Sequence, residues 1–361
     1  MKVLQIIPMF KLAGAETMCE NLCYALRAQG CNVIAVSLYT EHTPITDRLE
    51  HTGIRVEYLE KKKGFDFSTI VKLYRLIKKE KPEAVHTHIY AARYALPIAV
   101  FCGIPSKIHT VHNVAQQEQT KAGKIVNKFL FRHCGVVPVA LSEEVKKTVE
   151  VVYRVPEQKI PVVFNGIDLS KCQEKEDYTK KKEFKIIHIG RFMDVKNHGL
   201  ILRSFALFVK QHPDAKLQLL GEGELREEME QLAKGLQIES SVEFAGLQSN
   251  VYPWLHNADI FILPSKFEGM PMTLIEAMGT GLPIIASDVG GVPDMLTDGK
   301  DALLIKPSTE KLLYTMNILY DDARMRKQLG KNARKKSKLF SAETMAQKYI
   351  AIYKRTSARH G

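Results

Sequence analysis

Two basic side chains follow a predicted strand in the second half of the chain. Gly190 and Arg191 come directly after the apolar run 185–189, and Lys196 follows in the same loop. A guanidinium offers a planar fork of hydrogen-bond donors and an ammonium offers a compact charge, so together they suit a diphosphate. A solvated pair of surface charges is the plain alternative, but the position in a strand-to-helix loop favours a phosphate site.

The segment 263–279 combines a strand end, a Gly/Pro loop and a helix start. We predict that the helix begins near Met272, where free backbone N–H groups and the positive end of the helix dipole favour a phosphate. Glu268 precedes the loop, and Glu276 lies about one helical turn inside the helix. The two carboxylates would therefore bracket the anion and could hold hydroxyls of two different sugar rings. Paired carboxylates are also typical of glycosidases, but that function explains neither the helix start nor the basic pair.

Glycines mark two further strand-to-helix loops. Gly221 and Gly223 follow the apolar run 217–220, and Gly14 lies between the first strand and a helix. Glycine lets a backbone approach a ligand closely, although the pair at 221 and 223 is shorter than the Gly-rich fingerprint of dinucleotide-binding proteins. A tight turn explains Gly14 equally well, so these loops are weaker candidates than 263–279.

Histidines end two predicted strands in the first half. His86 and His88 are two residues apart, so they share one face of a strand and could bind a metal, but the sequence places no third ligand. Hydrogen-bonded buried histidines are the better explanation. His112 is the stronger functional candidate because it follows the run 108–111, at the strand's carboxyl end where open α/β sheets bind ligands.

Short apolar runs alternate with amphipathic stretches along the chain. Near-continuous apolar strands separated by helices indicate parallel sheet that is covered on both faces. The pattern stops over 171–184, which is poor in apolar residues, and then restarts, so we predict a linker there between two doubly wound α/β domains that face a central cleft. The predicted strands are 3–7, 33–38, 84–87, 108–111, 136–141, 161–164, 185–189, 217–220, 242–245, 260–263, 283–286 and 302–305.

Taken in order along the chain, these motifs resemble those of family 4 glycosyltransferases, the large retaining family with the GT-B fold. The Glu-x7-Glu element of Glu268 and Glu276 is central to the resemblance, which covers nearly the whole chain. The other motifs that carry it are Gly14-Ala-Glu16, His112, Asn165-Gly-Ile-Asp168, Gly190-Arg191 with Lys196-Asn197, Gly221-Glu-Gly223, and the segments 258–265 and 281–291.

The resemblance implies a hexosyltransferase that moves a hexose or N-acetylhexosamine from a nucleotide-diphosphate sugar, with a UDP-sugar as the expected donor. The acceptor is expected to be a saccharide or lipid-linked saccharide of cell-surface polysaccharide synthesis. The GT-B fold implies an acceptor-side domain over 1–170, a donor domain over 185–340, and a last helix, 341–361, that packs back onto the first. Neither a metal nor a cofactor is expected, in agreement with the absence of an Asp-x-Asp motif. A sugar-nucleotide epimerase of the same fold is the alternative.

The resemblance also implies roles for single residues. Arg191 and Lys196 hold the diphosphate and neutralise the charge on the departing group, an electrostatic contribution that usually dominates such chemistry. Glu276 binds the ribose, and the expected mechanism is front-face substitution, in which the leaving phosphate takes the acceptor's proton. The expected catalytic residues are His112, Arg191, Lys196 and Glu268. The expected donor-binding residues are Gly14, Gly190, Arg191, Lys196, Gly221, Gly223, Glu268, Gly269, Met270, Pro271, Met272, Leu274 and Glu276.

The composition is ordinary except for a surplus of positive charge. The chain has 361 residues, 45% of them hydrophobic, and a net charge of +12, which excludes a disordered, collagenous or coiled-coil protein. Its six cysteines are scattered without a Cys-x-x-Cys pair, which favours reduced thiols and a cytoplasmic protein. The longest apolar stretch, 94–102, contains Pro97 and is about half the ~20 residues that a membrane span needs.

The positive charge is concentrated in two segments. Residues 61–133 carry 14 Lys and Arg against 4 Asp and Glu, and residues 301–361 carry 14 against 5. Nucleic acid would suit this charge, but the chain has no helix-turn-helix, zinc-finger or RNP-type motif, and we expect no nucleic-acid partner. Two explanations remain open: a solvated surface, and a basic face that rests on anionic lipid at the inner face of the membrane.

Overall fold

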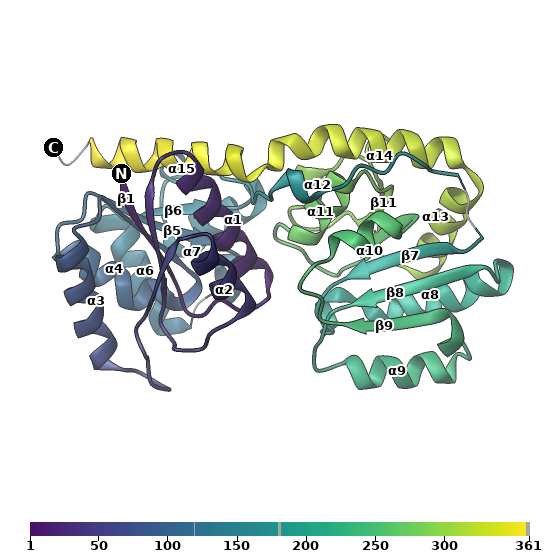
Figure 1. The fold of residues 1–361 in the computed structure, drawn as a ribbon, viewed down its shortest axis with the longest axis horizontal. Helices are drawn as coiled ribbons and strands as arrows, with labels where there is room; N and C mark the ends of the chain where they lie inside the picture. The colour runs from purple at the N-terminus through teal and green to yellow at the C-terminus, as the bar shows by residue number, and fades with distance from the viewer. Residues whose placement is uncertain (119, 180–181, 359–361) are drawn as a thin grey trace. The chain divides into compact units, whose positions relative to one another are not determined.

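The computed structural model describes residues 1–118, 120–179 and 182–358, and it divides into two units. Unit 1 comprises Met1–Ile167 together with the C-terminal segment from Ser341, and unit 2 comprises Asp168–Phe340 (Figure 1). Each unit contains one six-stranded sheet in which every pairing is parallel. The prediction of two doubly wound parallel-sheet domains is therefore confirmed.

Unit 1 has the strand order β3-β2-β1-β4-β5-β6, the order of the Rossmann fold. Its strands are β1 (Lys2–Ile7), β2 (Asn32–Ser37), β3 (Arg55–Tyr58), β4 (Ala84–His88), β5 (Ser106–Val111) and β6 (Val137–Ala140). Its α-helices are α1 (Gly14–Ala28), α2 (Pro44–His51), α3 (Phe67–Glu80), α4 (Ala92–Phe101), α5 (Ala115–Glu118), α6 (Lys121–His133), α7 (Glu143–Tyr153) and α15 (Ala342–Ser357).

Unit 2 repeats this order as β12-β11-β10-β7-β8-β9. Its strands are β7 (Phe184–Ile189), β8 (Ala215–Leu220), β9 (Val242–Gly246), β10 (Ile260–Leu263), β11 (Ile284–Ser287) and β12 (Leu303–Ile305). Its α-helices are α8 (His198–Gln211), α9 (Arg226–Gly235), α10 (Tyr252–Asn257), α11 (Met272–Thr280), α12 (Val292–Met295), α13 (Thr309–Asp321) and α14 (Ala323–Ser337).

One predicted strand is absent from the structure, and one observed strand was not predicted. The predicted strand 161–164 is not a strand: it makes one isolated bridge, between Val162 and Ala140, because Pro161 has no backbone N–H to donate to a ladder. Conversely, the edge strand Arg55–Tyr58 was not predicted. It contains charged residues and lies at the border of the sheet, where it is only partly buried, so it lacks the continuous apolar run of a central strand.

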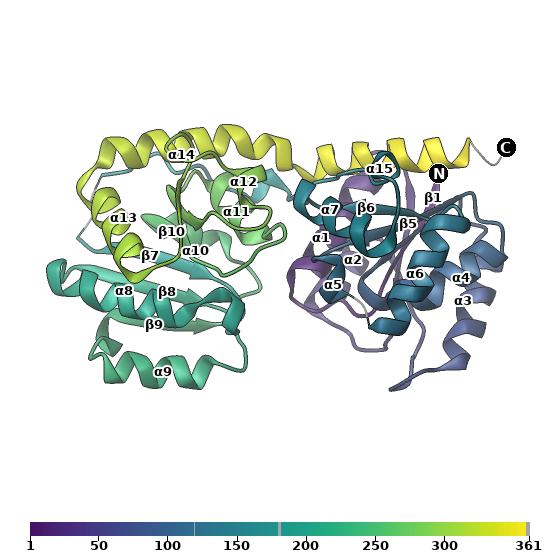
Figure 2. The same ribbon diagram turned by 180° about the vertical axis from the view of Figure 1, so that it is seen from behind.

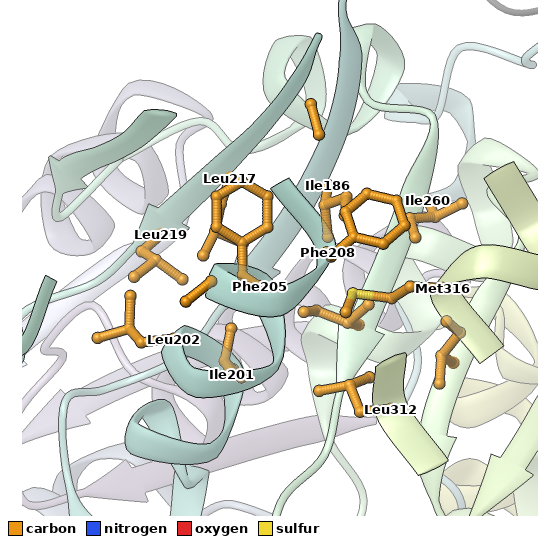
Figure 3. Close-up of a cluster of buried hydrophobic side chains, with 14 of the residues drawn as sticks. Ile186, Ile201, Leu202, Phe205, Phe208, Leu217, Leu219, Ile260, Leu312 and Met316 are labelled. Atoms are coloured by element: carbon orange, nitrogen blue, oxygen red, sulfur yellow. The ribbon is translucent and has the colours of Figure 1, made fainter. Parts of the chain in front are cut away.

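The core of unit 2 lies between its sheet and two helices that cover one face. Figure 3 shows Phe205 and Phe208 of α8 against Ile186 and Leu217 of the sheet, with Met316 of α13 beside them. All five side chains are fully buried. Because the central strands are covered in this way, their apolar runs are nearly continuous, which is the pattern from which they were predicted.

Of the segment predicted as a linker, 171–184, the residues 171–179 and 182–184 belong instead to unit 2, and residues 180 and 181 lie outside the described residues. Lys175 and Tyr178 are buried there although the segment is polar. Lys175 Nζ donates to the Ala258 carbonyl (2.7 Å), and Tyr178 Oη donates to the Gly281 carbonyl (2.7 Å). The polar side chains thus satisfy carbonyls that helices leave unpaired at their ends, which an apolar count cannot detect.

The last helix, α15, is part of unit 1. Its N-cap residue, Ser341, accepts a hydrogen bond from the Thr344 N–H and pairs with Ile167. A Cβ on Gly166 would lie 2.5 Å from the Ser341 carbonyl oxygen, so the approach of the two segments requires glycine there. Tyr349 and Tyr353 of this helix are fully buried.

Candidate functional site

Glycines bring two strand-to-helix loops of unit 2 into contact. The N–H of Gly190 donates to the Leu220 carbonyl (2.9 Å). A Cβ on Gly221 would lie 2.2 Å from the Gly190 oxygen, and one on Gly223 would lie 2.3 Å from the Phe192 oxygen. Both glycines are therefore required by the packing of one loop on the other, and they position the backbone on either side of Arg191.

Lys196 and Glu268 form an ion pair in which the carboxylate is buried and the ammonium is partly buried. Lys196 ends the short helix Asp194–Lys196, and its Nζ lies 2.6 Å from Oε1 of Glu268, whose side chain is 8% exposed. The backbone of Glu268 is held from the other side, because the N–H of Gly291 donates to its carbonyl (2.9 Å) and a Cβ on Gly290 would lie 1.8 Å from that oxygen. Gly290 lies in the segment 281–291, for which the sequence predicted no role. Because it has no side chain, its loop can pack against the backbone of Glu268, the predicted catalytic carboxylate.

Arg191 does not join this ion pair. Its side chain is 68% exposed and its Nη2 lies 3.3 Å from Oε2 of Glu224. Pairs of this kind contribute roughly 0–1 kcal/mol to stability. The Arg191 side chain therefore contributes little to the stability of the free protein, and its exposed guanidinium can bind an anion.

Alanine at Arg191 is expected to weaken binding of the donor diphosphate about tenfold and to leave the melting temperature within about 1 °C of wild type. The matched control is Glu224→Ala, which removes the partner of Arg191 without removing the cation. It should bind the donor as wild type does. Isothermal titration of UDP-glucose into each variant measures the effect, and equal losses in both variants would contradict a phosphate role for Arg191.

The N-terminus of α11 leaves backbone donors without helical partners. Its N-cap residue, Pro271, makes no side-chain cap, so the N–H groups of Met272, Thr273 and Leu274 have no partner within the helix. The Leu274 side chain is fully buried, so its predicted contact with the donor is limited to its backbone N–H. Gly269, Met270 and Pro271 form the loop before this turn, as predicted, and the first N–H groups of α11 itself are suited to a phosphate.

Glu276 is buried one turn inside α11. Its side chain is 8% exposed, and burial raises its pKa to about 8, against the opposing effect of Lys171. Burial also raises the pKa of the neighbouring Cys172 thiol to about 12. A Cβ on Gly279 would lie 2.6 Å from the Cys172 Sγ, so the thiol packs directly against Gly279. At neutral pH the free protein therefore holds Glu276 in its protonated form.

Two buried histidines lie beneath the basic loop and were not predicted. His188 donates from Nδ1 to the Ile262 carbonyl (2.9 Å), and His198 stacks on Phe192 with ring centroids 4.0 Å apart. Burial lowers the pKa of both, so both are neutral. A Cβ on Gly190 would lie 2.9 Å from His188 Nε2, so the His188 ring lies directly against the loop at Gly190. The sequence signal for this contact between His188 and the loop was limited to the position of His188 on a predicted strand.

In unit 1, Gly14 and His112 follow the carboxyl ends of two parallel strands. Gly14 is the exposed first residue of α1, and His112 comes directly after β5. Burial lowers the pKa of His112 to about 3, so its ring is neutral. His112 is thus suited to hydrogen bonding and not to carrying charge.

The two strand histidines, His86 and His88, use all four ring nitrogens in hydrogen bonds to side chains of unit 1. Their shortest contact is 2.7 Å, from His86 Nε2 to the Thr110 hydroxyl. Since each nitrogen is already engaged, the buried hydrogen-bonded arrangement accounts for both residues, and the metal alternative that the sequence left open gains no support.

Two family models together match most of the chain. The profile described as "Glycosyltransferase Family 4" matches residues 12–171, and that described as "Glycosyl transferases group 1" matches residues 170–336. The chain belongs to glycosyltransferase family 4. The boundary between the two profiles falls where unit 1 gives way to unit 2.

This family 4 glycosyltransferase has relatives of known activity. It is 28% identical over 288 residues, 75% of this chain and 74% of the relative, to the Escherichia coli UDP-Gal:alpha-D-GlcNAc-diphosphoundecaprenol alpha-1,3-galactosyltransferase. It is 29% identical over 310 residues, 80% and 79% of the two chains, to the N-acetyl-alpha-D-glucosaminyl L-malate synthase of Bacillus anthracis. The first of these names contains a sugar linked to diphosphoundecaprenol, and the second contains L-malate.

The GT-B fold of this family 4 glycosyltransferase is confirmed by solved structures. Anabaena Alr3699/HepE in complex with UDP-glucose aligns with a TM-score of 0.85 at 17% identity, over 98% of this chain and 99% of that one. At this identity the likeness establishes the fold. The sugar specificity of this chain is a separate question.

Proposed function

We propose that this glycosyltransferase is a retaining, metal-independent hexosyltransferase that uses a UDP-sugar, a hexose or N-acetylhexosamine donor. The observation that carries the proposal is the buried Lys196–Glu268 pair beside the uncapped N-terminus of α11. A cation and free N–H groups supply the positive charge that a departing diphosphate needs. The UDP and UDP-glucose complexes of Alr3699/HepE support the choice of nucleotide.

Each residue has a chemical role in this proposal. Lys196 and Arg191 bind the diphosphate and stabilise the charge that develops on it, while Glu276 accepts hydrogen bonds from the ribose. Glu268 holds the donor sugar, whereas the roles predicted for His112 and Gly14 of unit 1 stay predictions. The leaving phosphate takes the proton of the acceptor hydroxyl as that hydroxyl attacks from the same face, so the anomeric configuration is retained without a protein nucleophile.

A donor screen tests the proposal. UDP-glucose, UDP-galactose, UDP-N-acetylglucosamine and GDP-mannose are each added with EDTA present, and the melting temperature is recorded. A donor at 100 times its Kd stabilises the folded protein by about 2.7 kcal/mol, so one UDP-sugar should raise the melting temperature by several degrees. Conversion of the donor to another nucleotide sugar without acceptor would instead identify an epimerase. A dependence of transfer on added metal would contradict metal independence.

We further propose that the acceptor is a lipid-linked saccharide of cell-surface polysaccharide synthesis, reached at an anionic membrane surface. The name of the Escherichia coli relative includes diphosphoundecaprenol. Unit 1 also carries exposed apolar side chains in the basic segment 61–133. A basic face on anionic lipid was one of the two explanations for the charge of this segment. Among the described residues, no helix is both long and apolar enough to span a bilayer, so peripheral contact is the form of association proposed.

The exposed apolar face is defined by four residues on three neighbouring helices of unit 1 and one residue in the loop before α3. Helix α4 packs between α3 and α6 (Figure 2). Phe65 stacks on Tyr94 of α4 at a ring distance of 6.0 Å, which ties the α3 end of the face to α4. Helix α6 also carries Lys121, Lys124, Lys128 and Arg132, and basic residues on the same helix as exposed apolar ones suit anionic headgroups with acyl chains below them. The five residues are Phe65, Phe67, Phe101, Ile125 and Phe129.

Lys61, one of the basic residues of this segment, is not part of the face. It is buried, and its Nζ lies 5.2 Å from the Tyr39 ring and 5.3 Å from the Tyr94 ring. Its ammonium also donates to the carbonyl of Gly64. Lys61 therefore has a structural explanation, and Lys62 and Lys63, which are exposed, supply the charge at this end of the face.

The double variant Ile125→Ser with Phe129→Ser is expected to lose at least tenfold in binding to vesicles of phosphatidylglycerol and phosphatidylcholine, because each buried apolar side chain contributes roughly 1.5–3 kcal/mol. Co-sedimentation measures the loss. Tyr314→Ser on α13 of unit 2 is the matched control, since Tyr314 is similarly exposed (62%) but lies outside the face. Binding that ignores either the double variant or the phosphatidylglycerol content would contradict the membrane contact.

A further inference from the structure

Asn197 begins helix α8 but its side chain does not cap it. It is the N-cap residue of this helix, a position where asparagine is favoured because its side-chain oxygen accepts a hydrogen bond from a free N–H group of the first turn. Asn197 makes no such hydrogen bond, and its backbone is left-handed, with φ +59° and ψ +40°. An N-cap residue normally has an extended backbone. The residue type therefore suits a cap, but the geometry does not.

The side chain of Asn197 bonds instead to another loop. Its Nδ2 donates to the carbonyl of Pro264 (3.2 Å), the residue that directly follows β10. A carbonyl oxygen can only accept, so the amide nitrogen must face it. Because Pro264 begins the loop that carries Glu268, this hydrogen bond joins the loop after β7 to the loop after β10. Helix α8 thus forgoes the stabilisation of a cap, and the two loops of the candidate site gain a contact.

A second hydrogen bond joins the same two loops on the other side of Lys196. The N–H of Lys266 donates to the Val195 carbonyl (2.8 Å). Val195 and Asn197 are the two sequence neighbours of Lys196, so the backbone of Lys196 is held on both sides by the loop that carries Glu268. The ion pair between Lys196 Nζ and Glu268 Oε1 (2.6 Å) is therefore made from a backbone that these hydrogen bonds fix.

Two requirements meet at position 197. The backbone must be left-handed, a conformation that glycine and asparagine adopt more readily than other residues. The side chain must also carry an N–H group that can reach the Pro264 carbonyl, and asparagine meets both requirements. Glycine would keep the turn and lose the hydrogen bond, whereas aspartate would keep the shape of the side chain but has no N–H group to donate.

We propose that Asn197 is a positioning residue whose amide ties the loop of Lys196 to the loop of Glu268, and so holds the Lys196 ammonium where the donor diphosphate binds. This inference rests on the proposed function, in which Lys196 binds that diphosphate. Asn197 acts through Lys196 and is not a catalytic residue. Without its amide, the hydrogen bond at Val195 remains but the one at Pro264 is lost, so the ammonium is free to move away from Glu268.

Lysine NMR of the full-length protein without substrate tests the positioning directly. Proton–nitrogen correlation spectra of ¹⁵N-lysine-labelled protein detect ammonium groups that an ion pair protects from exchange with water, and Lys196→Arg assigns the Lys196 signal. In the wild type we expect a resolved, protected signal. In Asn197→Gly, which keeps the left-handed turn, we expect this signal to weaken or to move toward that of an exposed lysine.

A double-mutant cycle separates positioning from a general effect on α8. Asn197→Gly should lower kcat/KM for sugar transfer about five- to tenfold, the loss expected for one hydrogen bond. In protein that also carries Lys196→Ala, the same substitution should change kcat/KM by less than about twofold, because no ammonium is left to position. Losses that multiply in the double variant would indicate a structural role in the helix and would overturn the inference.

Gln237→Gly is the matched control. Gln237 has the same φ of +59° and also lies in unit 2, but it is exposed in the turn after α9. This substitution likewise replaces a left-handed residue by glycine, so it reproduces the cost of glycine in the unfolded chain. It should leave both the Lys196 signal and kcat/KM unchanged.

A wild-type spectrum without a protected Lys196 signal, or an unchanged signal in Asn197→Gly, would overturn the inference. If Asn197→Gly does not fold, Asn197→Asp is judged by the same criterion, since its carboxylate cannot donate to the Pro264 carbonyl. The signal is measured without donor, so a protein with the expected signals that transfers no sugar contradicts the proposed function and leaves the positioning by Asn197 supported.

Discussion

Replacing Lys196 with alanine is expected to lower kcat/KM for sugar transfer by about 10²–10³-fold, the typical loss when one preorganised group that stabilises developing charge is removed. The partly buried ammonium lies 2.6 Å from the buried Glu268 carboxylate. It is therefore held in place before the donor binds and spends little free energy on reorganisation during the reaction. Steady-state kinetics with the UDP-sugar found in the donor screen measure the effect.

The same substitution is expected to destabilise the fold, because it leaves the Glu268 carboxylate buried and without its partner. The double variant Lys196→Met with Glu268→Gln removes both charges. It should recover most of the lost melting temperature while its activity stays low, which separates stability from catalysis. A double variant that recovers activity along with stability would contradict the role of Lys196 in the reaction.

Lys266→Ala is the matched control for charge. Lys266 lies close in space to the 194–196 turn, where its Nζ pairs with Asp194, but the side chain is 51% exposed. We expect its kcat/KM to remain within about twofold of wild type, since exposed pairs contribute little. A loss in Lys266→Ala as large as that in Lys196→Ala would mean that general positive charge, and not the buried pair, is what the reaction requires.

The central architecture was predictable because parallel strands covered on both faces need nearly continuous apolar runs. Ile260–Leu263 and Ile108–Val111 are such runs, and both are strands of the structure. The proximity of Lys196 and Glu268 was predictable for a related reason: the loops after parallel strands meet at one edge of the sheet, although these two residues lie on different loops.

What the sequence did not reveal depends on contacts between distant segments. Gln5 and Tyr353 are 348 positions apart, and neither has a pattern that indicates its hydrogen bond to the other. Gly290 and Gly221 are glycines because backbone atoms of another loop occupy the space of a side chain, and no local motif names that loop. The polar segment 171–184 satisfies helix-end carbonyls, so its composition resembles that of a linker.

The affinity for the donor is expected to increase steeply with pH because of Glu276. Burial raises the pKa of this carboxyl from 4.5 to about 8 in the free protein, whereas two ribose hydroxyls are best accepted by the carboxylate. Donor binding would then require loss of the proton. The apparent Kd should therefore fall about tenfold per pH unit below about 8 and level off above it. UDP-glucose is the suitable probe because its diphosphate does not titrate in this range.

The stability of the free protein should change in the opposite sense. A carboxyl with a raised pKa contributes its full stabilisation below the unfolded value of 4.5 and loses it as pH rises through about 8. Glu276→Gln cannot ionise, so this variant should bind UDP-glucose weakly with no pH dependence and should melt above the wild type at pH values beyond about 8. A wild-type Kd that stays constant between about pH 6 and 9 would contradict the ionisation of Glu276 on binding, because the proton must leave between those values if the carboxylate holds the ribose.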